Sequence, residues 1–217
     1  MKKFAVIGLG KFGFHVARAL YEDGNEVVAI DLDRARVQAV TPYCSEAILL
    51  DASNREELNA LGLETMDGVI VSTGQRISTS ILICLYLNEI GVRNILAKAL
   101  DEDHEKILKK VGAAEVVHPE KDMANRVARG LSHPNVIDFI PLAEGYELVE
   151  VAAPSKFVGK SLKEINLRAK HNVHVIAVKE LAPENFVLAP HADFVIKAGD
   201  ILVILGLSQD IGKIKQP

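Results

Sequence analysis

Short apolar segments alternate with longer amphipathic segments over the first 118 residues of the chain. The short segments are dominated by Val, Ile, Leu and Ala, and each is only four or five residues long. A parallel strand that is covered by helices on both faces has this composition. The pattern therefore predicts six strands, at residues 3–7, 26–30, 46–50, 68–72, 94–98 and 114–117.

The segments between these strands have the spacing of apolar residues that is typical of helices. Helices are predicted at 11–23, 33–41, 54–61, 76–90 and 102–111, and a further one at about 120–132. Gly24, Gly62, Gly91 and Gly112 lie where four of them should end, and glycine is favoured at that position. Strands joined by helical crossovers predict an α/β protein with a Rossmann-type doubly wound parallel sheet.

The pattern changes after residue 132. Ser132-His133-Pro134-Asn135 is a cluster of residues that interrupt regular structure. Strands are then predicted at 146–151, 173–179, 185–188 and 201–206, with one short helix near 161–167. We expect a Rossmann-type domain over residues 1–134, a linker over 135–142 and a small α+β regulatory domain over 143–217. A domain of that size buries a modest core and is expected to need a partner chain.

Composition narrows the class of protein. The chain has 217 residues, 49% of them hydrophobic, and a formal net charge of −4, so no overall basic field favours nucleic acid or anionic lipid. No apolar run approaches the roughly 20 residues that span a bilayer. The apolar residues that follow Met1-Lys2-Lys3 are too few for a signal peptide, and Lys11 interrupts them. We expect a cytoplasmic protein in which Cys44 and Cys84 are buried thiols.

A glycine-rich segment follows the first predicted strand and begins the first predicted helix. Its sequence is Gly8-Leu9-Gly10-Lys11-Phe12-Gly13. In a βαβ unit the first glycine permits a tight turn, the second lets the main chain approach phosphates, and the third allows close helix–strand packing. The helix N-terminus adds free N–H groups and a partial positive charge. The segment therefore predicts a site for nucleotide phosphates.

Asp31 ends the second predicted strand, 18 residues after Gly13. A carboxylate at this point can accept hydrogen bonds from both ribose hydroxyls and would repel a 2′-phosphate, so NADP is disfavoured. The alternative interpretation is a glycine-rich structural turn followed by an aspartate that caps a helix.

Three further features lie near the same edge of the predicted sheet. Lys11 places a cation beside the phosphates, which suits ATP or ADP as well as a dinucleotide, unless it is simply a solvated side chain. Asp51 ends the third strand and either contacts the adenine or ribose or caps the next helix. Ser72-Thr73-Gly74 ends the fourth strand, at the edge where ligands of open α/β sheets bind.

The sequence contains no recognisable catalytic set. None of the four tyrosines is followed by Lys four residues later, as in short-chain dehydrogenases, and the chain has neither a G-x-S-x-G nor a Walker A motif. The seven histidines lack the spacing of a metal site. We expect binding without turnover, and a small NAD-dependent oxidoreductase is the alternative.

The predicted helix at 76–90 is apolar on all sides over residues 81–87. A helix that covers one face of a sheet is normally polar on its outer side. Either the second domain or another subunit must cover this helix, and we favour another subunit.

Several segments resemble the RCK (KTN) domains of potassium transport regulators, and most closely the cytoplasmic regulatory subunits of Ktr and Trk potassium uptake systems. The similarity lies in residues 4–13, in Asp31-Leu32-Asp33 and in residues 112–123, which contain the block His-Pro-Glu-Lys-Asp-Met. Residues 158–168 and 199–206 are similar to the C-terminal domain of the same family. The resemblance covers nearly the whole chain, and that block is far more specific than the glycine segment.

The resemblance implies a non-enzymatic subunit that forms dimers, assembles into an octameric ring and binds the cytoplasmic face of an integral-membrane potassium channel or transporter. It implies that ATP and ADP compete for the N-terminal site, although some family members bind NAD or NADH. A basic residue at the position of Lys11 is implied to reach the terminal phosphate across the dimer, and Glu120 to help hold Mg²⁺ or Ca²⁺. The family usually has an arginine at the position that Lys11 occupies in this chain. A lysine keeps the positive charge but cannot bind a phosphate with two parallel hydrogen bonds, as an arginine can.

Motifs and resemblance together give one set of expected cofactor-binding residues, in which Glu120 is also the metal ligand: Gly8, Leu9, Gly10, Lys11, Phe12, Gly13, Asp31, Asp33, Asp51, Ala52, Ser72, Thr73, Gly74, Lys98 and Glu120. In the C-terminal domain, Leu167, Arg168 and Ala169 match part of a pocket that binds cyclic di-AMP in some relatives. An NAD(H)-binding redox sensor is the alternative function.

Overall fold

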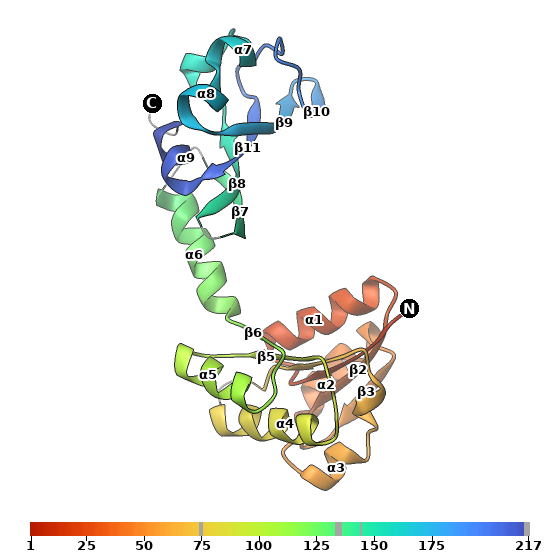
Figure 1. Cartoon of the computed structure of the whole chain (residues 1–217). Helices are drawn as coiled ribbons and strands as arrows, with labels where there is room; N and C mark the ends of the chain where they lie inside the picture. Colours follow the sequence, from red (N-terminus) through yellow and green to blue (C-terminus); the bar gives the residue numbers. More distant parts are fainter. Residues whose placement is uncertain (74–75, 133–135, 144, 215–217) are drawn as a thin grey trace. The chain divides into compact units, whose positions relative to one another are not determined.

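The structure is a computed structural model that describes residues 1–73, 76–132, 136–143 and 145–214, with the main chain alone at 129, 136–139, 141 and 143. The chain divides into two compact units, Met1–Glu120 and Lys121–Pro217. Each unit has its own sheet, as Figure 1 shows. Within the described ranges, no helix is long and apolar enough to cross a membrane.

The first unit contains a six-stranded parallel sheet with the order β3-β2-β1-β4-β5-β6. All six strands lie where the apolar segments predicted them. After β3 the chain crosses to the other side of β1, so the loops that follow β1 and β4 run in opposite directions and leave room for a ligand. The strands are β1 (Lys3–Ile7), β2 (Glu26–Asp31), β3 (Glu46–Leu49), β4 (Gly68–Val71), β5 (Ile95–Lys98) and β6 (Glu115–Val117).

Helices cover both faces of this sheet, which confirms the doubly wound architecture. Side chains alternate between the faces along each strand, so Val6 packs with α1 and α2 whereas Ile7 packs with α3, α4 and α5. Figure 1 shows α1 and α4 on opposite sides of the strands. The helices are α1 (Lys11–Glu22), α2 (Arg34–Val40), α3 (Arg55–Asn59), α4 (Ile77–Glu89) and α5 (Glu102–Lys110), with short 3-10 turns at Thr41–Tyr43 and Leu63–Thr65.

Side chains at the helix starts explain where two of these helices begin. Asp33 accepts the Ala35 N–H at 2.8 Å before α2, and Asp101 accepts the His104 N–H at 2.8 Å before α5. Each of these bonds satisfies a main-chain donor that has no partner inside its helix. The four glycines predicted at helix ends all have positive φ.

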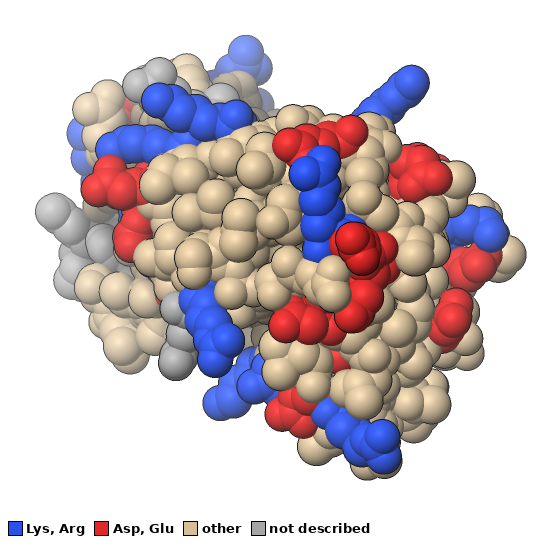
Figure 2. All heavy atoms as spheres, turned by 90° about the horizontal axis from the view of Figure 1, so that it is seen from below, with Lys and Arg blue, Asp and Glu red and all other residues tan. Residues whose placement is uncertain are grey.

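Helix α4 packs one side on the sheet through Ile83, Cys84 and Leu87, which are fully buried. On its other side, Ile77 and Leu82 are 37% and 38% exposed. Seen from below, in Figure 2, the face of the first unit that carries α4 has a broad area without charged side chains. The apolar character predicted for this helix is therefore present, and Ile77 and Leu82 carry it to the surface of the unit.

The second unit is built on a five-stranded antiparallel sheet with the order β10-β9-β11-β8-β7. Short helices pack on it around buried Val149, Ile165 and Ile204, so the predicted small α+β domain is confirmed. The strands are β7 (Val136–Ala143), β8 (Tyr146–Ala152), β9 (His174–Leu181), β10 (Glu184–Leu188) and β11 (Ile201–Leu207). The helices are α6 (Pro119–Ser132), which spans the division between the units, α7 (Leu162–Ile165), α8 (Leu167–His171) and α9 (Ser208–Ile214), with a 3-10 turn at Ser155–Phe157.

The segment expected to be a linker, 135–142, is largely the strand β7, which pairs with β8 at the edge of the second sheet. The two units divide after Glu120, earlier than the predicted boundary at 134–142. Pro141 lies within β7. Proline cannot donate to a strand ladder, but an edge strand has one side that needs no donor, so the residue is compatible with this position.

Candidate functional site

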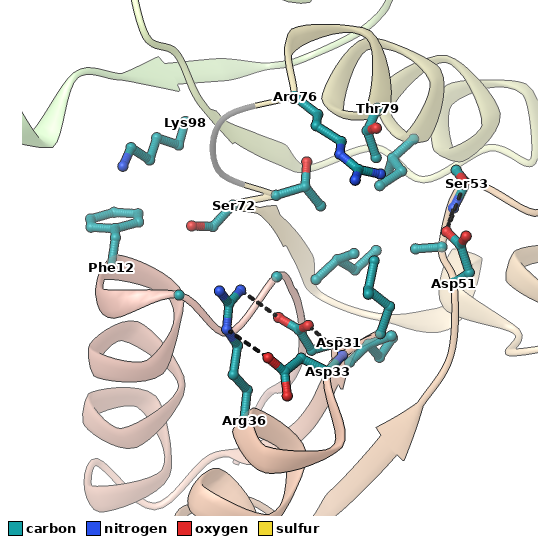
Figure 3. Close-up of a pocket in the computed structure, with 18 of the residues that line it drawn as sticks. Phe12, Asp31, Asp33, Arg36, Asp51, Ser53, Ser72, Arg76, Thr79 and Lys98 are labelled. Carbon is teal, nitrogen blue, oxygen red and sulfur yellow. Dashed lines mark hydrogen bonds and ion pairs between the residues drawn. The ribbon is translucent and has the colours of Figure 1, made fainter.

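A cleft of about 610 Å³ lies at the carboxyl edge of the first sheet, as Figure 3 shows. The ends of β1 to β5 or the loops that follow them contribute to it, together with Glu120 at the start of α6. Its lining residues are Ile7, Gly8, Gly10, Lys11, Phe12, Ile30, Asp31, Leu32, Asp33, Arg36, Leu50, Asp51, Ala52, Ser53, Ser72, Thr73, Arg76, Thr79, Ile83, Lys98 and Glu120. Of the residues predicted from sequence, Leu9 and Gly13 are buried and do not line the cleft. Gly74 lies outside the described residues.

The glycine turn at one end of the cleft depends on close main-chain contacts. Gly8 has φ +94°, and a Cβ on it would lie 2.4 Å from the Ser72 carbonyl oxygen. A Cβ on Gly13 would lie 1.9 Å from the Gly8 carbonyl oxygen. Gly10 differs, because it has φ −64° and a Cβ there would meet no atom within 4 Å. Two glycines are thus required by the fold itself, whereas Gly10 borders open space.

Helix α1 begins at this turn and directs its N-terminus to the cleft. Gly10 is the N-cap residue, no side chain caps the helix, and its first turn contains no acidic residue. The partial positive charge of the helix terminus is therefore not offset locally. Lys11 adds a full positive charge and is exposed at the lining of the cleft. This end of the cleft is suited to an anionic group.

Asp31 occupies the end of β2 and is only 7% exposed. One carboxylate oxygen accepts the Leu9 N–H at 2.6 Å, and the other accepts the Asp33 N–H at 2.8 Å. A carboxylate has about four lone-pair sites, so these two hydrogen bonds do not exhaust its capacity to accept. The side chain both holds the glycine turn in place and offers acceptor capacity to hydroxyl groups.

Arg36, which the sequence analysis missed, lies on the first turn of α2 and faces the same two aspartates. Its guanidinium nitrogens are 3.5 Å from the Asp31 carboxylate and 3.6 Å from that of Asp33. The side chain is 53% exposed, so these ion pairs contribute little to stability. They do offset part of the negative charge at this point of the cleft. An Arg three residues into the helix that follows an Asp-x-Asp segment was the available signal.

Asp51 lines the far side of the cleft, after β3. It accepts hydrogen bonds from the main-chain N–H of Ser53 at 3.0 Å and from its hydroxyl at 2.7 Å, and these bonds hold the pKa of Asp51 below its usual value. The N-cap of α3 is Asn54, whose side chain accepts from the Glu56 N–H. The capping role that was one alternative for Asp51 therefore belongs to Asn54, and Asp51 stays ionised at the cleft.

Ser72 and Thr73 border the cleft at the end of β4. The Ser72 N–H donates to the Ile7 carbonyl at 2.7 Å, which continues the sheet into the loop. Among the described residues, the buried Oγ1 of Thr73 has no hydrogen-bond partner. A buried polar atom without a partner is costly, and a ligand that supplied one would remove the cost.

Lys98 and Glu120 form an ion pair at the end of β5. The Lys98 side chain is 12% exposed, and Figure 3 shows its ammonium group at the side of the cleft near Phe12. The hydrogen bond from Lys98 lowers the pKa of Glu120. In the part of the chain that the structure describes, no group of three or more His, Cys, Asp or Glu side chains could hold a metal ion. A divalent cation near Glu120 would therefore need most of its oxygen ligands from a bound phosphate.

Sequence reasoning also missed Ser53, Arg76 and Thr79 as lining residues. Ser53 follows Asp51 by two residues and was detectable as an Asx-turn signal. Arg76 and Thr79 belong to the start of α4, and only the order of the strands brings them opposite β2 and β3.

In the second unit, Leu167 is buried at 4% exposure, whereas Arg168 and Ala169 are exposed on α8.

The chain matches two family models, the TrkA-N domain over residues 4–119 and the TrkA-C domain over residues 146–217. The Ktr system potassium uptake protein C of Bacillus subtilis (strain 168) is 40% identical over 215 residues, which cover 99% of this chain and 96% of that protein. The Ktr system potassium uptake protein A of the same organism is 39% identical over 210 residues, covering 97% and 94% of the two chains.

Solved structures share the fold. The RCK domain of GsuK covers 99% of this chain with a TM-score of 0.55 and 23% identity, and the match spans 46% of that chain. The GsuK channel bound to NAD covers 100% of this chain with the same TM-score and identity, over 38% of its own length. The TrkA-N domain of the inner membrane protein ybaL from Escherichia coli covers 60% of this chain with a TM-score of 0.54 and 22% identity.

The fold and the cleft thus define a two-domain RCK protein with a Rossmann-type first unit. This chain belongs to the family of Ktr and Trk potassium uptake regulatory proteins.

Proposed function

We propose that this chain is the regulatory subunit of a potassium uptake system that binds ATP or ADP in the cleft of its first unit. The similarity to Ktr proteins along both units supports the transport role. The observation that carries the nucleotide role is the glycine turn at the start of α1, which Asp31 holds beside a Thr73 hydroxyl that has no partner among the described residues. The subunit acts by binding and not by catalysis.

The ligand lies along the cleft in three parts. Its phosphates rest on the turn at Gly10, where the helix N-terminus is positive. Its ribose hydroxyls donate to the free lone pairs of Asp31. Its base extends toward Asp51 and Ala52. Such a pose uses the open space at Gly10, which a side chain would fill.

A divalent cation completes the phosphate end of the site. Mg²⁺ and Ca²⁺ prefer oxygen ligands, and Glu120 supplies one carboxylate while the phosphates supply others. Lys98 must then share Glu120 with the cation or move to a phosphate oxygen. Loss of the terminal phosphate removes oxygen ligands and weakens the binding of the cation. ATP and ADP therefore give the site different charge distributions.

Regulation follows from the difference between the two nucleotides. A ligand shifts a conformational equilibrium only if it binds the two states with different affinity. A coupling free energy of about 1–3 kcal/mol is typical of such systems and changes populations by roughly 5–150-fold. The terminal phosphate and its cation provide this difference in affinity, because Lys11 of one subunit reaches the phosphate that a second subunit binds.

The working unit is an oligomer on the inner face of the cell membrane, with dimers that assemble into an octameric ring beneath an integral-membrane potassium channel or transporter. The exposed apolar side chains of α4, Ile77 and Leu82, support contact with a second copy of the chain. The chain itself is cytoplasmic and reaches the membrane through its partner.

Titration calorimetry on the purified full chain with ATP, ADP, NAD and NADH tests the proposal. We expect ATP and ADP to bind more tightly than either dinucleotide, with no product formed over hours. NADH binding tighter than ATP by more than tenfold would replace the proposal by the redox-sensing alternative. Potassium flux into vesicles that contain the chain and its membrane partner should then differ between ATP and ADP.

The NAD-sensing alternative rests on one observation in the cleft. Asp31 at the end of β2 suits the ribose of a dinucleotide as well as that of ATP. A related channel has been solved with NAD bound. Hydride chemistry is not part of this alternative, because a sensor needs only different affinities for the oxidised and reduced forms.

The second unit is proposed to bind cyclic di-AMP at the interface between two copies. Arg168 is exposed on α8 and is available to a phosphate, whereas Leu167 is buried and would contribute only its main chain. Calorimetry with cyclic di-AMP on the full chain and on Arg168→Ala tests this, and equal binding by both proteins would contradict it.

A further inference from the structure

Arg76 is a lining residue of the cleft that neither the glycine motif nor the family resemblance pointed to. It is the N-cap residue of α4, and its carbonyl accepts from the N–H groups of Thr79 and Ser80 at 3.1 and 3.3 Å. The hydrogen bonds of the first helical turn therefore fix the main chain of Arg76. Figure 3 shows the guanidinium pointing from α4 into the cleft, across from the ends of β2 and β3.

Cations of the cleft fall into two groups by their partners. Arg36 pairs with Asp31 and Asp33, and Lys98 pairs with Glu120. In contrast, Lys11 and Arg76 form no hydrogen bond or ion pair through their side chains with the described residues. Lys11 stands at the phosphate end of the cleft, beside the glycine turn. Figure 3 shows the guanidinium of Arg76 nearer to Asp51 than to Phe12, which lies beside the glycine turn.

The surroundings of Arg76 are suited to a flat, partly polar group. The apolar side chains of Leu32 and Leu50, which follow β2 and β3, are among the residues that line the cleft. Asp51 borders it with a carboxylate that Ser53 holds in place and ionised. The hydrogen bonds from Ser53 are the main cause of the lowered pKa of Asp51, and the positive charge of Arg76 lowers it further. The charges of Arg76 and Asp51 therefore interact across the cleft.

We propose that Arg76 is a specificity-determining residue for the base of the nucleotide: its guanidinium stacks on a purine ring, and Asp51 accepts a hydrogen bond from the ring's amino group. This inference rests on the proposed nucleotide function of the cleft. A guanidinium is planar and weakly hydrated and stacks well on aromatic rings, which an ammonium group does not. A carboxylate only accepts hydrogen bonds, so it favours the 6-amino group of adenine and opposes the 6-oxo group of guanine or hypoxanthine.

Calorimetry with ATP, ITP and UTP on the full chain separates the two contributions, because ITP lacks the amino group and UTP lacks the purine ring. We expect the unmodified chain to prefer ATP over both. Arg76→Ala should lose about fivefold to tenfold in affinity for ATP and much less for UTP. Arg76→Lys should resemble Arg76→Ala, because the charge is kept but the plane is lost. Asp51→Asn should reduce the preference for ATP over ITP, because an amide can accept a hydrogen bond from an amino group or donate one to an oxo group.

Other outcomes overturn the inference in distinguishable ways. Equal losses for ATP and UTP in Arg76→Ala, with affinity restored in Arg76→Lys, would mean that Arg76 contacts a phosphate. Tighter binding of NADP than of NAD, abolished in Arg76→Ala, would assign Arg76 to a 2′-phosphate. Absence of nucleotide binding by the unmodified chain would overturn the proposed function and this inference together. Because Arg76 is exposed, we expect its variants to keep the unfolding temperature of the unmodified chain. That measurement is the check that each variant is folded.

Discussion

The carboxylate of Asp31 accepts the main-chain N–H of Leu9 at 2.6 Å, so the end of β2 holds the glycine turn that follows β1. A second bond, from the Asp33 N–H at 2.8 Å, fixes the other carboxylate oxygen. One side chain therefore serves both the fold of the turn and the proposed contact with ribose.

Asp31→Ala removes both roles. We expect nucleotide binding to be abolished, and the free energy of unfolding to fall by about 1–3 kcal/mol, because a buried N–H at Leu9 loses its acceptor. Asp31→Asn should lose binding as well but retain more stability, since the amide oxygen can still accept one hydrogen bond. Calorimetry and urea denaturation measure the two effects. Unchanged nucleotide affinity in Asp31→Ala would contradict the placement of the ribose.

The two glycines at Gly10 and Gly13 provide a matched pair. Gly13→Ala should destabilise the first unit by at least about 1–3 kcal/mol, because its Cβ would lie 1.9 Å from the Gly8 carbonyl oxygen. Gly10→Ala should fold with unchanged or slightly higher stability, because its φ of −64° suits alanine and nothing lies within 4 Å. The same Gly10→Ala should nonetheless bind ATP much more weakly, because the methyl group occupies the space proposed for phosphate. Normal ATP affinity in Gly10→Ala would refute that position.

Glu120 is predicted to connect the nucleotide to a divalent cation. Glu120→Gln keeps the size of the side chain but loses its charge, so the gain in ATP affinity on adding Mg²⁺ or Ca²⁺ should shrink by several-fold. Glu115→Gln, at an exposed position on β6, is the control and should respond as the unmodified chain does. Calorimetry with and without the cation gives the comparison. An identical cation dependence in Glu120→Gln would remove Glu120 from this role.

His104 should make the stability of the first unit depend on pH. It is 2% exposed, its Nε2 lies 2.8 Å from the Ser80 hydroxyl oxygen, and its Nδ1 accepts the Leu100 N–H at 3.3 Å. Burial lowers the pKa of His104 from its usual 6.5, with Asp101 opposing and His118 adding to the shift. Below pH 6.5 the unfolded chain therefore binds a proton that the folded chain does not, and stability falls as the pH falls toward the folded pKa.

Urea denaturation between about pH 7.5 and 5.5 checks this expectation, since that window spans the usual titration of histidine and lies above that of the carboxylates. His104→Gln should flatten the pH dependence, because glutamine does not titrate. His15→Gln, at an exposed position on α1, should leave it unaltered. A pH dependence that persists fully in His104→Gln would assign it to another group.

The outer side of α4 is predicted to lie against another copy of the chain. Leu82→Glu places a charge on a side chain that is 38% exposed, so we expect the oligomer to dissociate without loss of the fold. Tyr21→Glu, at 40% exposure on α1, is the control of similar exposure. Sedimentation velocity at micromolar concentration measures the result. An unmodified chain that sediments as a monomer would count against the interface.

Most of the first sheet and the glycine turn at one end of the cleft could be predicted from sequence, because both depend on local patterns. Apolar runs with helical segments between them give the parallel strands, and the glycine turn with Asp31 gives the start of the site. The strand β7 could not be predicted in this way. Its residues follow a cluster of structure-breaking residues, and only pairing with β8 makes them a strand.

The sequence by itself determined the periodicity of the elements, the turn at Gly8–Gly13 and the carboxylate at the end of β2, because these features rest on contacts between near neighbours along the chain or on the requirements of one backbone conformation. Only the tertiary structure decided that Arg76 lies across the cleft from Asp51 and that His104 meets Ser80. These pairs come from separate elements, and the strand order that brings them together is set by burial of the whole core and not by any short segment.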